Sequence, residues 1–325
     1  MRSQVDISII LEWENVLLSG DDRCTEMLSI LRSQLNQIKQ SVEIIVLFNA
    51  EQIERSQIEP LLQQYLLSNC DTDTLNLRLE EANGLHYYEL KNEGARRAKG
   101  EIIVFIDSDV LPEENWLPMI SQPFFNDTTI EVVAGETYLS FDNLYEKAFA
   151  LGWFFPLRNS NSELHANGKG FVANNVAFRR ETFLRFSFPK EPEGLTRGAC
   201  GQLAKSLIDA DIDIWTNTAA RAQHPPPTGI KHYLVRALAD GRDHAMRQLS
   251  DNFSVFTILE NSFKWSIKRI GNTVHAIKVS RQHVGLSLWQ APAAFVVMAF
   301  FYSLSFIGTV LTLLFPKYAK NHWVL

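Results

Sequence analysis

The sequence has little cysteine and no concentration of positive charge. Its 325 residues include three cysteines, Cys24, Cys70 and Cys200, which lie far apart and show no Cys-x-x-Cys spacing. This pattern argues against a disulfide framework or a cysteine-based zinc site and favours a reducing compartment. The formal net charge is −6 and no long basic block is present, so we expect no nucleic-acid partner.

The N-terminus lacks the features of a secretory signal. Its first apolar run, residues 7–11, is too short for a signal-peptide core, and Glu12 follows immediately. We therefore expect the N-terminal domain to lie in the cytosol.

Charged side chains are absent from a long stretch near the C-terminus. After Arg281, no Asp, Glu, Lys or Arg occurs until Lys317. Residues 291–315 are enough to cross a hydrocarbon core of about 30 Å at a rise of about 1.5 Å per residue. Aromatic residues typical of membrane interfaces flank this segment, namely Trp289, Tyr318 and Trp323. The pattern predicts one transmembrane helix.

An amphipathic helix is predicted just before this apolar segment. From Phe256 to Ile277, apolar residues recur at spacings of three or four, and lysines and arginines occupy the other faces. Two interpretations remain open, because such a helix can lie on an anionic membrane surface or pack against the catalytic domain.

The first two thirds of the chain alternate between strand-like and helix-like segments. Strands are expected at residues 6–11, 43–48, 85–90 and 101–106, and helices from Asp21 or Asp22, at 51–67 and at 92–99. This alternation predicts an α/β fold with a mostly parallel sheet flanked by helices. Ligands of such sheets bind beyond the carboxyl ends of the strands.

The strongest local motif lies at one of these strand ends. The apolar run 102–106 is followed directly by Asp107, Ser108 and Asp109. Two carboxylates at this spacing are able to bind a magnesium or manganese ion, which also binds diphosphate oxygens. An isolated Asp-x-Asp is more often a polar turn or a helix cap, so the neighbouring sequence must decide.

The neighbouring sequence resembles that of the family-2 glycosyltransferases, which have the GT-A fold. In that family an Asn-x-Gly and then an Ala-x-Gly segment precede the strand that carries the Asp-x-Asp motif. Here the matching stretch runs from Asn92 to Gly100. The resemblance implies that Asp107 lies near the donor ribose and the metal ion, and that Asp109 is a direct metal ligand.

Further matches extend the resemblance over most of residues 5–227. Residues 170–180 resemble the acceptor-side segment, and residues 222–224 resemble a late strand that supplies a metal- or diphosphate-binding histidine. The resemblance, together with the residues that stand at positions where this sequence departs from the family, predicts donor-binding residues Glu12, Trp13, Glu14, Asn49, Asn92, Gly94, Arg97, Asp107 and Ser108, acceptor-side residues Asn174, Asn175 and Arg179, and metal ligands Asp107, Asp109 and His224.

Two departures concern the nucleotide. The loop after the first strand commonly carries Pro and Tyr in the family, whereas here it reads Glu12, Trp13, Glu14, Asn15. Trp13 could stack on a base or lie in the core, and Glu14 could accept a hydrogen bond from a base. The second strand normally ends in acidic residues, but here Asn49 stands at that end and could pair with a base edge.

The third departure concerns catalysis. Inverting members place a Glu-Asp pair at the start of a helix, and its Asp deprotonates the acceptor hydroxyl. Ala199 and Cys200 occupy these positions here. The candidate replacement bases are Glu191, Glu193 and Cys200, with Glu136 a further option. An acceptor that is already ionised, such as a lipid phosphate, would need no base.

These observations predict four regions: a GT-A-like catalytic domain at residues 1–228, juxtamembrane helices at 229–284, a transmembrane helix at 285–316 and a tail at 317–325. The predicted protein is a single-pass membrane glycosyltransferase with its catalytic domain on the cytoplasmic face. It transfers a sugar from a nucleotide-sugar donor to a lipid-linked or glycan acceptor, depends on manganese or magnesium, and inverts the anomeric centre. The alternative is a catalytically inactive nucleotide-binding or partner-binding membrane protein on the same fold.

Overall fold

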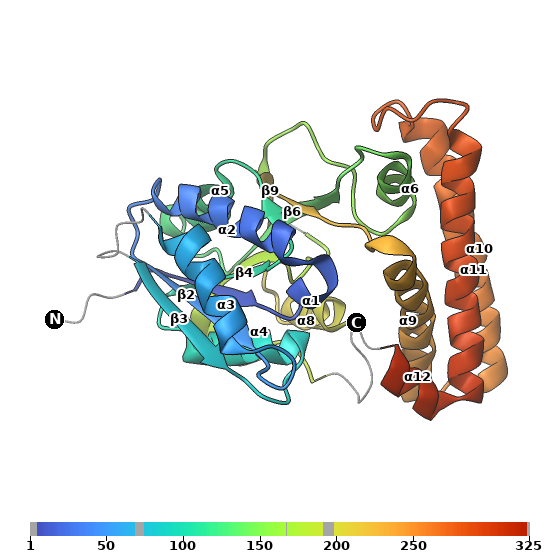
Figure 1. Cartoon of the computed structure of the whole chain (residues 1–325), viewed down its shortest axis with the longest axis horizontal. Helices are drawn as coiled ribbons and strands as arrows, with labels where there is room; N and C mark the ends of the chain where they lie inside the picture. The colour runs from blue at the N-terminus through green and yellow to red at the C-terminus, as the bar shows by residue number, and fades with distance from the viewer. Residues whose placement is uncertain (1–4, 69–74, 167, 191–197, 324–325) are drawn as a thin grey trace. The chain divides into compact units, whose positions relative to one another are not determined.

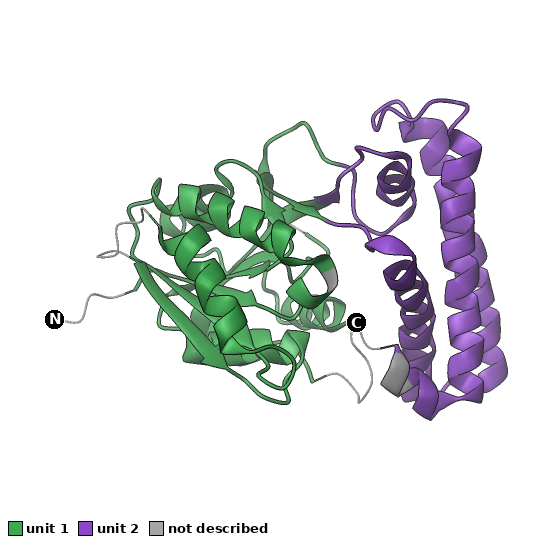
Figure 2. Ribbon diagram, in the orientation of Figure 1, with its two compact units in different colours: residues 1–137, 158–190, 198–224 green, residues 138–157, 191–197, 225–325 purple. Residues whose placement is uncertain are grey.

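The computed structural model of the chain describes residues 5–68, 75–166, 168–190 and 198–323. The chain divides into two compact units (Figures 1 and 2). Unit 1 contains residues 1–137, 158–190 and 198–224, and unit 2 contains residues 138–157, 191–197 and 225–325. A segment from the middle of the sequence, residues 138–157, therefore groups with the C-terminal helices.

Unit 1 is built on one mixed sheet. Its strand order is β3-β2-β1-β4-β8-β6-β9-β5, and β7 pairs with β9. The strands are β1 (Ile7–Glu12), β2 (Val42–Phe48), β3 (Leu75–Glu81), β4 (Ile102–Asp107), β5 (Leu111–Pro112), β6 (Val132–Leu139), β7 (Leu164–His165), β8 (Asn175–Arg179) and β9 (Ile214–His224). The α/β fold class is confirmed, but the parallel part is limited to β1–β4, because β8 pairs antiparallel with both β4 and β6.

Helices cover both faces of this sheet. The helices of unit 1 are α1 (Val16–Ser19), α2 (Asp21–Leu35), α3 (Arg55–Leu61), the π-helix η1 (Leu62–Leu67), α4 (Tyr87–Arg97), α5 (Trp116–Asn126), α7 (Arg180–Phe186) and α8 (Ala199–Asp209). Side chains alternate between two cores along each strand. On β4, Val104 packs in the core with α2, α3 and α5, whereas Phe105 packs in the core with α4, α7 and α8.

The prediction of a strand at residues 85–90 is wrong, because most of this segment is helical. The third strand ends at Glu81, and α4 begins at Tyr87, where His86 and Glu89 form a reciprocal capping box. These capping bonds satisfy backbone N–H groups that a helix start leaves unpaired, so they stabilise a helix at this apolar and aromatic segment. The helix expected from residue 51 likewise begins later, at Arg55, behind a second capping box formed by Glu54 and Gln57.

Unit 2 is helical in the part that the structure describes, apart from the end of β6. Its helices are α6 (Leu144–Gly152), α9 (Gly229–Ser250), α10 (Val255–Ser280), α11 (Ala291–Leu314) and α12 (Pro316–His322). Helices α9 and α11 cross closely, because a Cβ atom on Gly241 would collide with the backbone of Ser305, and one on Gly308 with the backbone of Leu238. Of the described helices, α11 alone is long and apolar enough to span a membrane, with a mean hydropathy of 2.1.

Helices α10 and α11 bury small polar side chains and expose apolar ones. On α10, Ser262 and Ser266 are buried, whereas Phe256 is 76% and Phe263 is 53% exposed. The same inversion occurs on α11, where Ser305, Thr309 and Thr312 are buried and Val296, Phe300 and Leu314 are exposed. The predicted amphipathic helix thus exists, but within unit 2 much of its apolar stripe is left uncovered.

Candidate active site at the edge of the sheet

Acidic side chains gather where the parallel strands end. In the parallel register of β1 and β4, Glu12 lies opposite Asp107. Ile10 and Phe105, two residues earlier on these strands, belong to the core beneath α4, so Glu12 and Asp107 point to that same face. Both side chains are almost fully buried, at 0% and 2% exposure. The sequence therefore folds two carboxylates into one shielded position.

The Asp107 carboxylate is held by three partners that the sequence motif does not reveal. Lys91 Nζ lies 2.6 Å from Oδ1, and the Tyr87 hydroxyl donates to both oxygens at 3.0 and 2.8 Å. Asn15 Nδ2 donates to Oδ2 at 3.1 Å. Lys91 and Tyr87 lie one turn apart on α4, so that helix presents both groups to the strand end.

The neighbouring Glu12 carboxylate is only half satisfied. Its Oε2 accepts the backbone N–H groups of Glu14 at 2.8 Å and Asn15 at 3.3 Å, which closes the turn after β1. Its Oε1 is buried without a hydrogen-bond partner among the described residues. Burial, followed by repulsion from Asp107, raises the pKa of Glu12 well above its usual value. A donor group or a cation at Oε1 would relieve this cost.

Asp109 and Ser108 carry further buried polar atoms without partners. Asp109 Oδ1 and Ser108 Oγ have no hydrogen-bond partner within the described part of the chain. Burial and the adjacent Asp107 raise the pKa of Asp109 from 3.8 to about 7. An uncompensated carboxylate at such a position is costly unless it binds a cation or a proton.

The loop that carries Asp109 is tied to the end of β9. Arg23 on α2 donates from Nε to the Asp109 carbonyl at 2.5 Å and from Nη2 to the Gln223 carbonyl at 2.8 Å. In addition, β5 pairs with β9 so that Leu111 lies opposite Gln223. The next residue on β9 is His224, which the fold therefore brings beside the Asp109 loop.

This arrangement fits a hard divalent cation. The orphaned oxygens of Asp109 and Glu12 are of the type that magnesium and manganese prefer, and an imidazole at His224 is a further ligand for manganese. The described residues contain no ready-made group of three His, Cys, Asp or Glu side chains for a metal. Magnesium in enzymes commonly uses one or two carboxylates together with substrate phosphates and water. The donor set here matches that mode.

Several predicted donor-binding residues are engaged within the protein instead. Trp13 is 1% exposed and belongs to the core beneath α2, so the core interpretation applies. Arg97 pairs with Glu80 at 2.6 Å and Glu93 at 2.8 Å. Asn92 exchanges two hydrogen bonds with the backbone of Phe188.

Three further residues predicted to bind the donor, Gly94, Asn49 and Glu14, also make contacts within the protein. Gly94 allows α4 to pack on the sheet, because a Cβ atom there would lie 2.5 Å from Ile10 Cγ2. Asn49 is 6% exposed and closes the turn after β2 through the Glu51 backbone N–H. Glu14 lies 3.3 Å from His86 Nδ1, and burial raises the pKa of its carboxyl.

The acceptor-side residues are paired within the protein, and Arg179, which lies opposite Ile102, stands at the other end of β4 from Asp107. Asn175 accepts from Trp116 Nε1 at 2.8 Å and donates to the Ala220 carbonyl at 3.0 Å. Asn174 accepts from the Thr137 hydroxyl at 3.1 Å. Arg179 pairs with Glu101 at 2.7 Å and donates to several backbone carbonyls. These contacts organise β8 and its neighbours.

Of the residues predicted as the catalytic base, the structure describes Cys200 but not Glu191 or Glu193. Burial raises the pKa of the Cys200 thiol to about 11, and the Sγ atom lies 3.4 Å from the Tyr88 hydroxyl. The neutral thiol is therefore the stable form at physiological pH, and it is not a base. Glu191 and Glu193 lie outside the described residues.

Comparison with known families identifies the domain. The family model described as "Glycosyl transferase family 2" matches residues 25–185. The chain carries a family-2 glycosyltransferase domain. It is accordingly a glycosyltransferase, and the Asp-x-Asp strand with its preceding helix lies inside the matched region. No curated protein sequence matches the chain.

Two solved structures align with most of this chain. A mannosyltransferase from Pyrobaculum calidifontis, in complex with GDP-Man and Mn²⁺, aligns over 97% of this chain and 89% of its own, with a TM-score of 0.55 and 14% identity. Residues 1–349 of S. aureus TarS, in complex with UDP-GlcNAc, align over 95% of this chain and 92% of that one, with a TM-score of 0.49 and 13% identity. At 14% identity the first match shows the fold alone.

Sequence reasoning missed the residues that hold the carboxylates. Lys91 directly precedes the Asn-x-Gly segment, and Tyr87 lies four residues before Lys91. A lysine on an otherwise buried helix face was therefore an available signal. Arg23 had no such signal, because its partners Asp109 and Gln223 are 86 and 200 residues away.

Proposed function

We propose that this glycosyltransferase is metal-dependent and inverting, and that it transfers a sugar from a nucleotide-sugar donor to a membrane-associated or glycan acceptor. The observation that carries the proposal is the set of buried oxygens of Glu12, Ser108 and Asp109 at the sheet edge, for which the described part of the chain supplies no hydrogen-bond partner. Ligands of such sheets bind at this edge, and a nucleotide-sugar donor together with its cation would satisfy these atoms.

In this proposal, different residues of the sheet edge bind different parts of the donor and its cation. Asp109 and His224 hold the cation, which, when bound, offsets the negative charge that develops on the departing nucleoside diphosphate. Lys91, Tyr87 and Asn15 fix the Asp107 carboxylate, so that it stays oriented towards the donor ribose and the metal site. Glu12 Oε1 accepts a hydrogen bond from the nucleoside. The GDP-Man and Mn²⁺ bound to the Pyrobaculum enzyme are consistent with this assignment.

We further propose that α11 anchors the protein as a single membrane span, with the catalytic domain on the cytoplasmic face. The support is the length and hydropathy of α11, and the apolar side chains that α10 and α11 leave exposed while small polar ones are buried. In a membrane, close helix contacts use small residues and apolar side chains face lipid. An acceptor carried on a lipid would then lie at the same surface.

The second candidate is a protein of this fold that binds a donor without transferring sugar. Ala199 and Cys200 favour it, because neither supplies the carboxylate base of inverting relatives and the Cys200 thiol is neutral. This candidate predicts donor binding without release of a nucleoside diphosphate.

Donor hydrolysis by detergent-solubilised protein tests the proposal. A panel of UDP-, GDP- and dTDP-sugars is incubated with manganese or magnesium, and the released nucleoside diphosphate is measured. We expect release with one class of donor, dependent on the metal, and a loss of about a thousandfold or more in Asp109→Asn. Binding of manganese, followed by electron paramagnetic resonance with the nucleoside diphosphate present, should weaken in the same variant.

The matched control is Asp209→Asn, which makes the same chemical change at the exposed end of α8, where the Asp209 side chain is 60% exposed. It should keep full turnover and metal binding. Donor binding without release, even with membrane-lipid extract as acceptor, would reject the transferase in favour of the second candidate. Release that survives in Asp109→Asn would reject the metal site.

A further inference from the structure

Glu136 lies at the same level of the sheet edge as Asp107. In the antiparallel register, Ile106 on β4 lies opposite Asn175 on β8, and Val176 lies opposite Ala134 on β6. Gly135 is therefore level with Asn175, and a Cβ atom on Gly135 would collide with the Asn175 side chain. Glu136, one step further, is level with Asp107. The two lie two strands apart, or roughly 10 Å at the usual strand spacing.

The two carboxylates also share one face of the sheet. Ala134, two residues before Glu136, and Phe105, two residues before Asp107, both belong to the core beneath α4 and α8. Alternation along each strand places Glu136 and Asp107 on that same side. Cys200, at the start of α8, packs against this core as well. Glu136 therefore occupies the side of the sheet where relatives carry their acidic pair.

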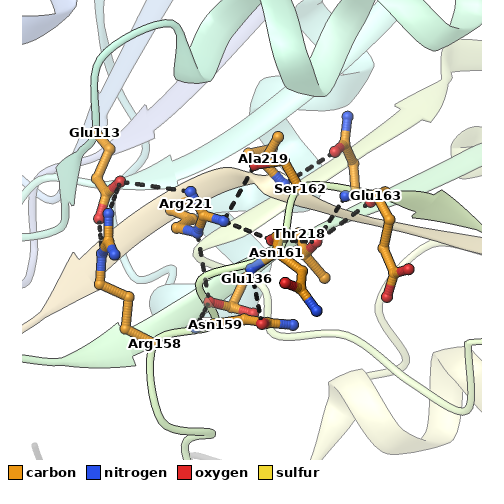
Figure 3. Close-up of polar contacts among 12 residues, drawn as sticks. Glu113, Glu136, Arg158, Asn159, Asn161, Ser162, Glu163, Thr218, Ala219 and Arg221 are labelled. Atoms are coloured by element: carbon orange, nitrogen blue, oxygen red, sulfur yellow. Dashed lines mark hydrogen bonds and ion pairs between the residues drawn. The ribbon is translucent and has the colours of Figure 1, made fainter. Parts of the chain in front are cut away.

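The Glu136 carboxylate is buried and oriented by a network (Figure 3). Its Oε1 accepts the Asn159 backbone N–H at 2.6 Å and lies 3.7 Å from Arg221 Nε. Both contacts within the described residues engage Oε1, which leaves Oε2 for a substrate. Its exposed fraction is 8%.

Two arginines and a second glutamate surround Glu136 and have opposing effects on its pKa. Arg158 forms a bidentate pair with Glu113 at 2.6 and 2.9 Å, and Arg221 lies 3.9 Å from the same glutamate. Burial raises the pKa of Glu136, whereas the Asn159 bond, Arg221 and Arg158 oppose the rise and Glu113 adds to it. A carboxylate whose pKa is moved towards neutrality is a better proton acceptor at physiological pH.

The segment that covers Glu136 is tied to β9. Arg221 donates to the Asn161 carbonyl at 2.6 Å, and Glu163 and Thr218 exchange hydrogen bonds (Figure 3). These contacts fix the Asn159 backbone, and through it the Glu136 carboxylate. A base needs such fixed geometry to act on a bound hydroxyl.

We propose that Glu136 is the general base of the transfer, in place of the acidic pair that is missing at Ala199 and Cys200. In the reaction, Glu136 Oε2 takes the proton of the acceptor hydroxyl while the acceptor oxygen bonds to the anomeric carbon. The bond from that carbon to the phosphate oxygen breaks, and its electron pair leaves with the nucleoside diphosphate. This inference rests on the proposed transferase function.

The test compares two acceptors in the same assay, using the donor that the wild-type protein hydrolyses. Water must lose a proton to act as an acceptor, whereas azide is already ionised and needs no base. In Glu136→Gln we expect hydrolysis to fall by about a hundredfold to ten-thousandfold. Transfer to azide, measured as glycosyl azide, and the donor Kd should both stay within about threefold. The matched control is Glu163→Gln, which makes the same chemical change at an exposed side chain in the segment that covers Glu136. It should leave both reactions unchanged.

Equal losses with water and azide would overturn the assignment, because they would indicate a structural or donor-binding role. Unchanged hydrolysis in Glu136→Gln would overturn it as well. In either case wild-type turnover would leave the proposed transferase function standing. A wild-type protein that binds donors but turns over none of them would reject the transferase function and the base together.

Discussion

The two halves of the sheet edge treat their polar side chains differently. At the ends of β1 and β4, Glu12 and Asp109 keep buried oxygens that find no hydrogen-bond partner among the residues that the structure describes. At the start of β8, the side chains of Asn174 and Asn175 are used in hydrogen bonds within the protein. Buried polar groups normally find partners because an unmade hydrogen bond is costly. This difference supports the proposal that the first half binds the donor, whereas the contacts of the second half hold strands together.

The same contrast separates motif residues whose polar groups are paired within the protein from a motif residue that keeps an unpaired oxygen. Arg97 and Asn92 belong to a matching motif, but their polar groups bond to Glu80, Glu93 and Phe188. Asp109 belongs to the motif and keeps an oxygen that no described residue satisfies. Substitutions in the first group should change stability, and substitutions in the second should change donor chemistry. Four variants at residues that contact or neighbour these groups sharpen the comparison, beginning with the largest expected effect.

Lys91→Met should cost most, because it leaves the Asp107 carboxylate buried without its cation. Lys91 is 0% exposed and lies 2.6 Å from Asp107, and breaking a buried pair by removing one partner costs about 3–5 kcal/mol. Urea unfolding monitored by circular dichroism measures the loss. Adding Asp107→Asn should restore part of the stability. A single variant as stable as the wild type would show that the pair does not hold the edge together.

Asn175→Ala should destabilise the protein less and leave the donor Kd unchanged. The variant removes hydrogen bonds to Trp116 and to the Ala220 carbonyl inside the sheet, which predicts a loss of about 1–3 kcal/mol. Unfolding and donor titration are measured on the same preparation. A large rise in donor Kd with unchanged stability would place Asn175 in the ligand-binding half and break the comparison.

Glu80→Gln should have a smaller, pH-dependent effect. Hydrogen bonds and ion pairs with Arg97 and Arg78 outweigh desolvation and lower the pKa of Glu80 below 4.5. The native state thus favours the ionised form, and its contribution to stability is present above pH 4.5 and lost as the pH falls through the lowered pKa. The variant should be less stable than the wild type at pH 7, by at most about 1 kcal/mol, and equally stable far below pH 4.5. A difference that persists in acid would contradict the ion-pair explanation.

Cys200→Ala should have the smallest effect on turnover. A thiol with a pKa of about 11 stays protonated from pH 6 to 9, so its removal should change donor hydrolysis by less than about threefold across that range. The shape of the pH profile should also stay the same. A lost alkaline or acidic limb in the variant would restore Cys200 as a participant in proton transfer.

The sequence by itself determined the features that depend on local patterns. Runs of apolar residues placed β1, β2 and β4, and the following Asp107 and Asp109 were recognisable because a strand end delivers adjacent residues to one edge. The long uncharged segment specified α11 in the same way. The early start of α4 was missed, because the capping bonds between His86 and Glu89 depend on backbone geometry that the apolar pattern does not reveal.

Only the tertiary structure decided which polar groups meet. Asp107 finds Lys91 sixteen residues away, and Arg23 reaches Gln223 across 200 residues. Glu136 reaches the level of Asp107 through the order β4-β8-β6, in which the intervening strand comes later in the sequence than both. Strand order and register are set by packing of the whole domain. For that reason the partners of each carboxylate, and hence its chemistry, could not be deduced from spacing along the chain.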